Sequence, residues 1–395
     1  MSQAQNNNET GKVIRPGGTI GVLGGGQLGR MLALAGRAMG YRFVTLDPTP
    51  DAPCGQVADR QIVASYDDVE AARALAEQSD VITYEFENVD ADVTGLLMAE
   101  SYVPQGSQLL YTTQHRLREK RAIEAAGVKV APYAEIASAE QLREAVQRFG
   151  TPCVLKTATG GYDGKGQWVI RSLDEVEEAF ATLSKAKTEL VLEQFIHFEK
   201  ELSVIAARSP RGEVKAFPAA ENIHINNILH LSIVPARTSE SIQQEAERLA
   251  MRIAESLNVI GLIAVEMFLT RDGQLFVNEL APRPHNSGHY TMEACATSQF
   301  EQHVRAICNL PLGSTELLTP VVMVNVLGQH VEPLLDWIVK PESEQVAPGV
   351  TAKVHLYGKS ESKHNRKMGH VNVLAGSTDA AMQWIEASDI WKSNN

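Results

Sequence analysis

The sequence predicts a mixed fold in which an α/β region at the N-terminus precedes a longer α+β region and a short C-terminal region. Its 395 residues are long enough for two or three domains with buried cores. Before residue 112, short apolar runs alternate with stretches of helical spacing, which is typical of α/β folds. After Thr151, apolar runs follow one another at hairpin spacing, which is typical of antiparallel sheet.

The N-terminal region follows a strand–helix–strand rhythm. This alternation implies a parallel sheet with helices on both faces. The expected elements are strands at Thr19–Leu23, Arg42–Leu46 and Val81–Tyr84, and helices from Gln27 to about Met39 and at Asp67–Gln78.

Hairpin-like strands dominate the rest of the chain. A helix is expected from Thr112 or Thr113 to Gly127, because glycine commonly ends a helix. Strands are expected at Cys153–Thr157, Gln167–Ile170, Leu190–Phe195, Glu201–Ala207, Glu213–Pro218, Leu231–Val234, Leu262–Leu269 and Gln274–Leu280, with helices at Leu173–Ala186 and Ser239–Leu257. After Pro311 we expect strands at Val321–Val326, Ala352–Leu356 and Val371–Ala375, and a helix from about Thr378.

Composition and charge argue against several classes of function. The formal net charge of −12 disfavours non-specific binding to nucleic acid or to an anionic membrane surface. No apolar run approaches the ~20 residues that cross a bilayer, and the polar first residues do not resemble a signal peptide. The four cysteines form no CxxC pair, which favours a reducing compartment. We therefore expect a cytoplasmic protein that binds neither nucleic acid nor membrane.

Gly24, Gly26 and Gly29 form a GxGxxG pattern between the first strand and the first helix. Such glycines let a ligand approach the backbone, and the N-terminus of a helix offers free N–H groups to an anion. Asp47 closes the next strand at about the spacing expected for an acid that binds a ribose. The pattern is compatible with a dinucleotide, with a purely structural tight turn, or with another anion or sugar ligand.

A second glycine cluster lies between two expected strands. Because no helix follows it, it is not a Walker loop, but a glycine-rich flap between strands can fold over a triphosphate. Lys165 and the preceding Lys156 would then face phosphate oxygens; the alternative is a flexible surface hairpin with a solvated lysine. The flap comprises Gly160, Gly161, Tyr162, Asp163, Gly164, Lys165 and Gly166.

The pair Asp272-Gly273 is typical of a two-residue type I′ hairpin turn. If these are the two turn residues, Glu266 lies opposite Glu279, and Asn278 points to the other face of its strand. Facing carboxylates destabilise a sheet by a few tenths to about 1 kcal/mol, and apolar neighbours keep water away from this pair. A bound divalent cation explains the pair best, and oxygen ligands that leave room for substrate phosphates are typical of Mg²⁺. The alternative is two glutamates on a solvated face.

Two more groups stand out late in the chain. Arg283 and His285 lie in APRPHNSGH, where prolines fix the backbone, and this favours a functional role. A local basic cluster in an acidic chain could bind phosphate, although a charge run is usually a solvated face. The cluster comprises Lys359, Lys363, Arg366 and Lys367, with His364 and His370.

Five segments together resemble the 5-(carboxyamino)imidazole ribonucleotide synthases, the ATP-grasp enzymes of purine biosynthesis. They are GGGQLGRM (24–31), YEFENV (84–89), LKTATGGYDGKGQ (155–167), LEQFI (192–196) and NELAPRPHNSGH (278–289). The resemblance runs from about Thr19 to Gly369 in the expected order. It implies a Rossmann-like preATP-grasp domain at 16–111, an ATP-grasp domain at 112–312 and a small β-rich C-terminal domain at 313–395. It also implies a homodimer. The polar composition of residues 1–15 predicts a flexible tail before these domains.

The resemblance also assigns residues to ligands, with either Glu193 or Glu201 on the ribose of ATP. For ATP it implies Arg116, Lys156, Gly160, Gly161, Tyr162, Asp163, Gly164, Lys165, Gly166, Glu193, Gln194, Phe195, Ile196, Glu201, His224, Asn278 and Glu279. For the ribonucleotide it implies Gln27, Leu28, Glu85, Arg283, His285, Asn286, Lys359 and Arg366, and Glu266 and Glu279 match the magnesium ligands.

The implied reaction begins with attack of bicarbonate on the γ-phosphate of ATP, which gives carboxyphosphate and ADP. Carbon dioxide is then delivered to the exocyclic amine of 5-aminoimidazole ribonucleotide. Lys165, Arg283 and His285 are the candidate catalytic residues, and imidazole is a candidate base because it titrates near neutrality. Lys165 stands where the family commonly has arginine, so the charge is kept but the bidentate fork is lost.

Three other functions stay open. A formate-using ATP-grasp transformylase acting on glycinamide ribonucleotide shares the domain order and the carboxylate pair, but GGYDGKG and Asn286 favour the carboxylase. An NAD-dependent oxidoreductase is suggested only by the first glycine pattern and Asp47, and it leaves the facing glutamates unexplained. A non-catalytic nucleotide-binding regulator would show no magnesium-dependent release of ADP.

Overall fold

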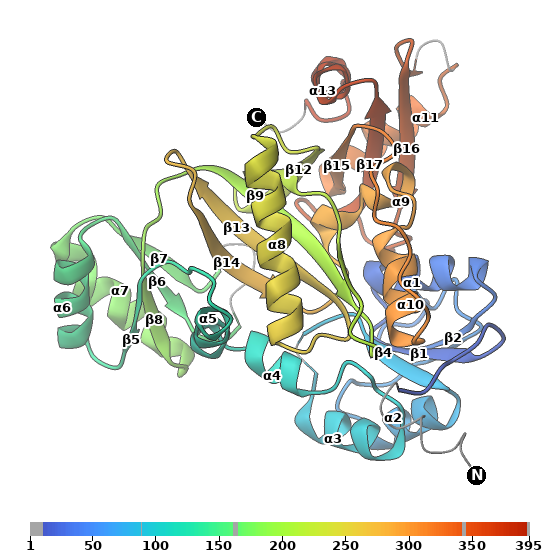
Figure 1. Cartoon of the computed structure of the whole chain (residues 1–395), viewed down its shortest axis with the longest axis horizontal. Coiled ribbons are helices and arrows are strands. Elements are labelled where there is room, and N and C mark those ends of the chain that lie inside the picture. The colour runs from blue at the N-terminus through green and yellow to red at the C-terminus, as the bar shows by residue number, and fades with distance from the viewer. Residues whose placement is uncertain (1–10, 88, 161–164, 342–344, 393–395) are drawn as a thin grey trace.

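The structure, a computed structural model, describes residues 11–87, 89–160, 165–341 and 345–392. It contains three sheets: a parallel sheet near the N-terminus, a small antiparallel sheet and a long sheet that runs through the centre of the molecule (Figure 1). The predictions for Gly161, Tyr162, Asp163 and Gly164 of the flap lie outside the described residues.

The N-terminal sheet is parallel, as predicted, and its strand order is β3-β2-β1-β4. Apolar residues of α1 and α10 pack against one face, and residues of α2 and α3 pack against the other. The elements are β1 (Thr19–Leu23), α1 (Gln27–Ala38), β2 (Arg42–Leu46), β3 (Arg60–Ile62), α2 (Val69–Glu77), β4 (Val81–Tyr84) and α3 (Ala91–Glu100).

The helix predicted from Thr112 or Thr113 to Gly127 is two helices, α4 (Gln108–Thr113) and α5 (Arg116–Ala125). His115 has an extended backbone at the start of α5. The N–H of Arg116 donates to the carbonyl oxygen of Ala158 at 2.9 Å, not to the preceding turn of the chain. This long-range bond fixes the start of α5 beside the second glycine cluster, and no local sequence pattern could have shown it.

The small antiparallel sheet forms a separate lobe at the left of Figure 1, with strand order β5-β8-β6-β7. Its helices and strands enclose their own hydrophobic core. The elements are β5 (Tyr133–Ile136), α6 (Ala139–Phe149), β6 (Cys153–Thr157), β7 (Gln167–Ile170), α7 (Val176–Leu183) and β8 (Leu190–Gln194).

The central sheet has nine strands in the order β14-β13-β9-β11-β12-β15-β17-β16, with β10 paired to β9. The strands after Pro311 do not form a sheet of their own, because β15 pairs with β12 and so continues the same sheet. The strands are β9 (Phe198–Arg208), β10 (Val214–Ala216), β11 (Ala220–Ile225), β12 (Ile228–Val234), β13 (Gly261–Thr270), β14 (Leu275–Ala281), β15 (Val321–Leu327), β16 (Val350–Leu356) and β17 (Lys367–Ala375). The helices here are α8 (Glu240–Ser256), α9 (Thr291–Ala294), α10 (Gln299–Ile307), α11 (Val331–Ile338) and α13 (Thr378–Ala387).

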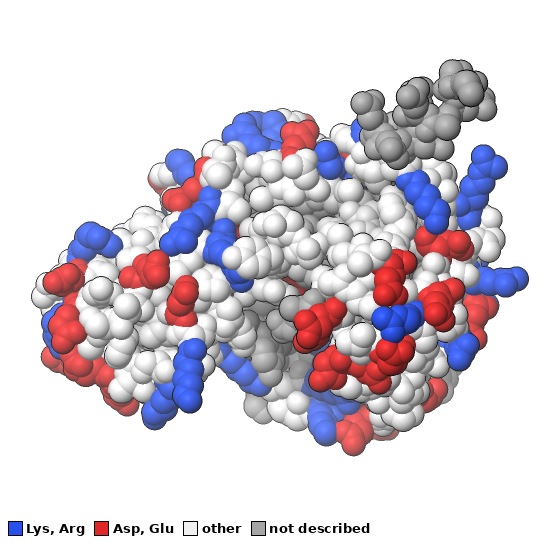
Figure 2. Space-filling view, turned by 90° about the horizontal axis from the view of Figure 1, so that it is seen from below, with Lys and Arg blue, Asp and Glu red and all other residues white. Residues whose placement is uncertain are grey.

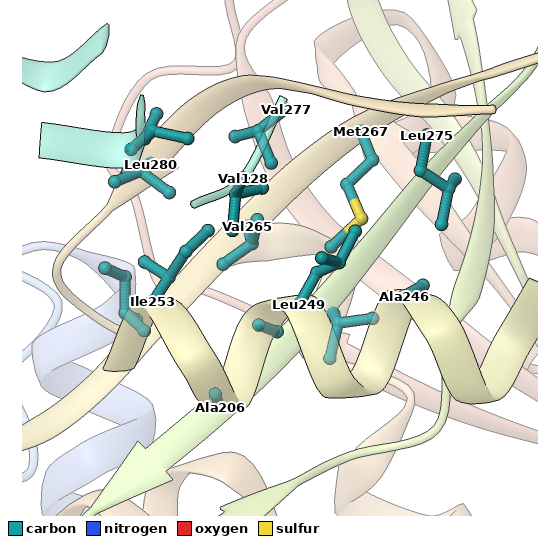
Figure 3. Close-up of a cluster of buried hydrophobic side chains, with 14 of the residues drawn as sticks. Val128, Ala206, Ala246, Leu249, Ile253, Val265, Met267, Leu275, Val277 and Leu280 are labelled. Atoms are coloured by element: carbon teal, nitrogen blue, oxygen red, sulfur yellow. The ribbon is translucent and has the colours of Figure 1, made fainter. Parts of the chain in front are cut away.

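The largest hydrophobic core lies between α8 and the sheet (Figure 3). Leu249 and Ile253 of α8 pack on Val265 and Met267 of β13 and on Val277 of β14. Because side chains alternate along a strand, the residues between these apolar positions face the other side of the sheet. That opposite side carries the candidate site.

None of the described helices combines the length and the apolar character needed to cross a membrane. On the face shown in Figure 2, Lys and Arg side chains are interspersed with Asp and Glu side chains.

Candidate active site

Glu266 of β13 pairs directly with Glu279 of β14, as predicted. The predicted two-residue turn, however, is wrong. Gly273 has φ +80° and its N–H donates to the carbonyl oxygen of Thr270 at 2.9 Å, and the N–H of Thr270 donates back across the hairpin, so the loop has one more residue. The longer loop shifts the pairing by one residue, and a β-bulge beside Glu266 shifts it back. The two shifts cancel, which is why the glutamates still face each other.

The bulge also changes which side chains of β14 share a face. Val277 and Leu280 both belong to the core under α8, although they are three residues apart. Asn278 and Glu279 both line a cavity on the opposite side of the sheet. The prediction that Asn278 points away from Glu279 is therefore wrong. The three-residue spacing of Val277 and Leu280 is the sequence signal that could have indicated the extra residue.

Two cavities meet at these carboxylates. Cavity A, about 490 Å³, lies between the small sheet and the central sheet, and cavity B, about 470 Å³, lies between the N-terminal domain and the end of β14. Cavity A is lined by Arg116, Lys156, Lys165, Glu193, Gln194, Phe195, Ile196, Glu201, His224, Glu266, Asn278 and Glu279, among others. Cavity B is lined by Gln27, Leu28, Glu85, Glu87, Glu119 and Gly160, among others.

A group of residues lines both cavities and so marks their junction. Both polar atoms of the Asn286 amide are buried without a hydrogen-bond partner among the described residues. An unpaired buried amide is costly, which is consistent with a ligand that bonds to it. The shared residues are Arg116, Glu279, Arg283, His285, Asn286 and Lys367.

The facing carboxylates carry an excess of negative charge. Burial and the charge of Glu279 raise the pKa of Glu266 to about 7, and they raise the pKa of Glu119 to about 8. Two basic side chains lie near the pair: Arg116 Nη1 is 3.6 Å from Glu279 Oε2, and Nε2 of the His285 imidazole is 3.4 Å from Glu266 Oε1. Hard oxygen donors in this state suit Mg²⁺. Within the described part of the chain no group of three or more His, Cys, Asp or Glu could hold a metal.

A second carboxylate in cavity A is held by two lysines. Lys156 Nζ donates to Glu193 Oε2 at 2.9 Å, and Lys120 Nζ lies 3.2 Å from Glu193 Oε1. Burial opposes ionisation, but the two lysines prevail and lower the pKa of Glu193 to about 2. Glu201 instead pairs with His224, whose Nδ1 is 3.2 Å from Glu201 Oε2.

The first glycine loop binds a carboxylate of the protein itself. The N–H of Gly29 donates to Glu85 Oε2 at 2.5 Å, and the N–H of Gly26 donates to Glu85 Oε1. A Cβ atom at residue 26 would meet Glu85 Oε1 at 2.5 Å, so the glycine permits this approach. Asp47 is buried, and its Oδ2 accepts from the N–H of Gly25 at 2.8 Å. The N–H groups and the acid of the dinucleotide pattern are thus already engaged, which argues against a dinucleotide at this place.

The basic cluster is dispersed in the structure. Lys359 Nζ donates to Gln27 Oε1 at 2.5 Å, and burial and Arg366 lower the pKa of Lys359 to about 8. Arg366 Nη1 donates to the carbonyl oxygen of Glu361, and neither Lys359 nor Arg366 lines cavity A or cavity B. His370 does not belong with the exposed cations, because it is buried between other histidine rings. Lys367 is the member of the cluster that lines both cavities.

Arg283 and His285, from the proline-rich segment, both lie at the junction. Arg283 Nη2 forms an ion pair of 2.9 Å with Glu87 Oε1. His285 Nδ1 is 2.8 Å from Ser287 Oγ. Burial and the nearby Arg283 keep the pKa of His285 well below its ordinary value, so the imidazole is neutral but weakly basic. This weakens the case for His285 as a general base.

Sequence analysis missed several residues of the site. Glu119 and Lys120 lie on α5, one turn after Arg116. Arg116 and Glu119 line cavity B, and Lys120 contacts Glu193. The N–H of Leu280 donates to Glu119 Oε1 at 2.7 Å, which ties α5 to β14. The i, i+3, i+4 spacing of charges on one helix face was the available signal, but such charges are usually solvated.

Comparisons with known proteins cover almost the whole chain. Three family models match: a ribonucleotide synthetase preATP-grasp domain at residues 18–114, an ATP-grasp domain at 121–300, and a phosphoribosylaminoimidazole carboxylase C-terminal domain at 321–383. The chain is 52% identical over 385 residues to the N5-carboxyaminoimidazole ribonucleotide synthase of Bacillus subtilis. The aligned residues cover 97% of this chain and 98% of that protein. It is 42% identical over 372 residues to the same enzyme of Staphylococcus aureus, with 94% and 96% covered.

Solved structures show the same similarity. An ADP complex of an N5-carboxyaminoimidazole ribonucleotide synthetase has a TM-score of 0.91 and 56% identity, with 96% of this chain and 98% of that chain covered. The Staphylococcus aureus synthetase with ADP has a TM-score of 0.88 and 40% identity, with 97% and 100% covered. The Aspergillus clavatus synthase with ADP and 5-aminoimidazole ribonucleotide has a TM-score of 0.85 and 32% identity, with 93% and 96% covered.

Proposed function

The chain belongs to the N5-carboxyaminoimidazole ribonucleotide synthase family of ATP-grasp ligases, and from this premise we propose the reaction that it catalyses. It carboxylates the exocyclic amine of 5-aminoimidazole ribonucleotide, using ATP and bicarbonate, in purine biosynthesis. The relatives are named for this product, which favours it over formyl transfer to glycinamide ribonucleotide.

The observation that carries the proposal is the junction of two cavities at one set of polar residues. A reaction that first activates bicarbonate on ATP and then transfers its carbon needs two adjacent ligand sites with a shared boundary. Cavities A and B share six such residues, among them Arg116, Glu279 and Asn286. Cavity A is the proposed ATP site and cavity B the proposed ribonucleotide site.

In cavity A, Lys156 and Lys165 bind phosphate oxygens and the segment Glu193–Ile196 contacts the adenine. Because two lysines already hold Glu193, Glu201 is the better partner for the ribose hydroxyls of ATP. Arg116, His224 and Asn278 line the same cavity and complete the nucleotide site. The substrate phosphates lie at the end where Lys156 and Glu279 are found.

Glu266 and Glu279 would hold Mg²⁺, and their facing positions on β13 and β14 support this assignment. When bound, Mg²⁺ neutralises charge on the phosphates of ATP. The protein's own cations serve the transferring phosphoryl group in the same way: Lys156 from one side and Arg116 from the other.

In cavity B, Gln27, Leu28 and Glu85 bind the ribonucleotide, and Lys359 and Arg366 approach its phosphate from outside the cavity wall. Bicarbonate oxygen attacks the γ-phosphorus atom, the bond to the β-phosphate oxygen breaks, and ADP and carboxyphosphate form. Carboxyphosphate releases phosphate and carbon dioxide, the amine nitrogen attacks the carbon, and the nitrogen loses one proton. Arg283 and His285 at the junction orient the carboxyl group, and Asn286 donates to it.

Release of ADP tests the proposal directly. The protein is incubated with magnesium-ATP and labelled bicarbonate, with and without 5-aminoimidazole ribonucleotide. We expect ADP release that depends on the ribonucleotide, together with acid-labile fixation of labelled carbon. ADP release that needs formate and glycinamide ribonucleotide instead would identify a transformylase. No ADP release with either set of substrates would refute the proposal.

We also propose the domain boundaries, the cellular location and the oligomeric state of the protein. The domains are 16–111, 112–312 and 313–395, which agree in order with the three matching family models. The protein acts in the cytoplasm as a homodimer on small molecules, without binding nucleic acid or membrane. Sedimentation velocity at micromolar concentration tests the dimer, and a monomer under all conditions would contradict it.

A further inference from the structure

Lys120 of α5, which lies within the described residues, is deeply buried and lines neither cavity A nor cavity B. Its side chain is 1% exposed, and its Nζ lies 3.2 Å from Glu193 Oε1. The other oxygen of that carboxylate accepts a hydrogen bond of 2.9 Å from Lys156 Nζ. Lys156 and Glu193 both line cavity A. Lys120 therefore contacts Glu193 from outside the cavity, while Lys156 contacts it from the cavity wall.

The charges of this trio do not balance. Two ammonium groups share one carboxylate, so one positive charge is in excess in a buried environment. Such a charge is costly unless an anion compensates it. Paired with Lys156 alone, Glu193 would cancel the charge of Lys156, and the attraction of that lysine for an anion would weaken. With Lys120 present, the surplus lies at Lys156, the lysine that faces cavity A.

We propose that Lys120 is a positioning residue for nucleotide binding: it supplies the countercharge of Glu193 from outside cavity A, which leaves the ammonium group of Lys156 available to phosphate oxygens. The inference rests on the proposed function, because it takes cavity A as the site of a nucleoside triphosphate.

The chain contains a matched control for a purely structural role. Glu221 is also a buried carboxylate that two cations share, Lys200 at 2.9 Å and Arg237 at 2.6 Å. All three residues are described and none of them lines cavity A or cavity B. Lys200→Met thus removes a cation from an equivalent trio away from the ligands.

The experiment compares wild type, Lys120→Met, Lys120→Arg and Lys200→Met by calorimetric titration with magnesium-ADP and by steady-state kinetics. For Lys120→Met we expect the Kd of magnesium-ADP and the KM of ATP to rise roughly tenfold or more, the size expected when a charged hydrogen-bond partner is lost. The KM of the ribonucleotide should change by less than about twofold, because cavity B does not depend on Lys156. Lys120→Arg should restore most of the affinity, and Lys200→Met should lower thermal stability without changing either constant.

A folded Lys120→Met variant with the wild-type Kd for magnesium-ADP would overturn the inference, as would an equal rise in the KM of both substrates. If Lys120→Met does not fold, the Kd of Lys120→Gln decides in the same way. Wild-type protein that binds no magnesium-ADP would instead refute the proposed function, so the two failures are distinguishable.

Discussion

Glu266 and Glu279 are direct partners across β13 and β14, and the charge of Glu279 helps to raise the pKa of Glu266 to about 7. Two like charges in this position oppose the pairing of their strands. The arrangement therefore costs stability in the absence of a cation and is useful only when one binds. Stability and activity should respond in opposite directions when one of the charges is removed.

Glu279→Gln is expected to raise the free energy of unfolding of the magnesium-free protein by about 0.2–1 kcal/mol, because the cross-strand repulsion disappears. The same change should lower magnesium-dependent ADP release by at least roughly tenfold. Denaturant titration in EDTA and a coupled ADP assay measure the two effects. Glu135→Gln, which alters an exposed ion pair with Arg121, is the control. A Glu279→Gln variant with full activity would remove the metal assignment.

Lys359 should give the ribonucleotide site a distinctive pH dependence. Burial and Arg366 lower the pKa of Lys359 to about 8, so its ammonium group is charged below that pH and neutral above it. We expect kcat/KM for the ribonucleotide to fall as the pH rises through about 8, because this parameter reports the free enzyme. Lys359→Ala should raise KM for the ribonucleotide far more than for ATP, and its profile should lack the fall.

Lys363→Ala serves as the control for that profile, since Lys363 is exposed and pairs with Glu361. Its profile should match wild type. If kcat/KM for the ribonucleotide also falls above about pH 8 in Lys359→Ala, another group is responsible for the titration.

Gly26→Ala should damage cavity B without greatly unfolding the protein. The added Cβ would meet Glu85 Oε1 at 2.5 Å and push the carboxylate from the glycine loop. We expect KM for the ribonucleotide to rise and KM for ATP to stay near wild type. Gly95→Ala, at an exposed position of helix α3 with open space around it, should instead stabilise the protein by roughly 0.5–1 kcal/mol. An unchanged ribonucleotide KM in Gly26→Ala would argue against Glu85 as a ligand.

Ile253→Ala should lower the free energy of unfolding by about 2–5 kcal/mol, because Ile253 is fully buried between α8 and the sheet. Chemical denaturation measures the change. Leu335→Ala on α11, where the side chain is 40% exposed, should stay within about 0.5 kcal/mol of wild type. Equal losses in both variants would mean that the core under α8 is not the main source of stability.

The sequence predicts elements where apolar runs are strong, and it fails where they are weak. β1, β4 and β15 are almost wholly buried and were found from their apolar runs. β3 and β5 are short and partly exposed, so no apolar pattern marks them. They are strands because a neighbouring strand pairs with them, which is a tertiary effect.

In the candidate site, too, the sequence predicts contacts that are local along the chain and misses those between distant segments. Glu266 and Glu279 lie on one hairpin, so a count along the chain brought them together, although by two compensating errors. The contact between Lys120 and Glu193 and the ion pair between Arg283 and Glu87 join residues from distant parts of the chain. Only the fold brings such residues together, and local periodicity contains no trace of them.

The pairing of β12 with β15 has a consequence for how the molecule can be divided. A chain that stopped before residue 321 would leave β12 as an edge strand with unpaired N–H and C=O groups. Such an edge can pair with another chain and so promotes aggregation. The segment from residue 321 onward is therefore no detachable module. Neither truncation nor the exchange of this segment between homologues can succeed at the boundary suggested by sequence alone, unless the new partner offers a strand that fits the same edge.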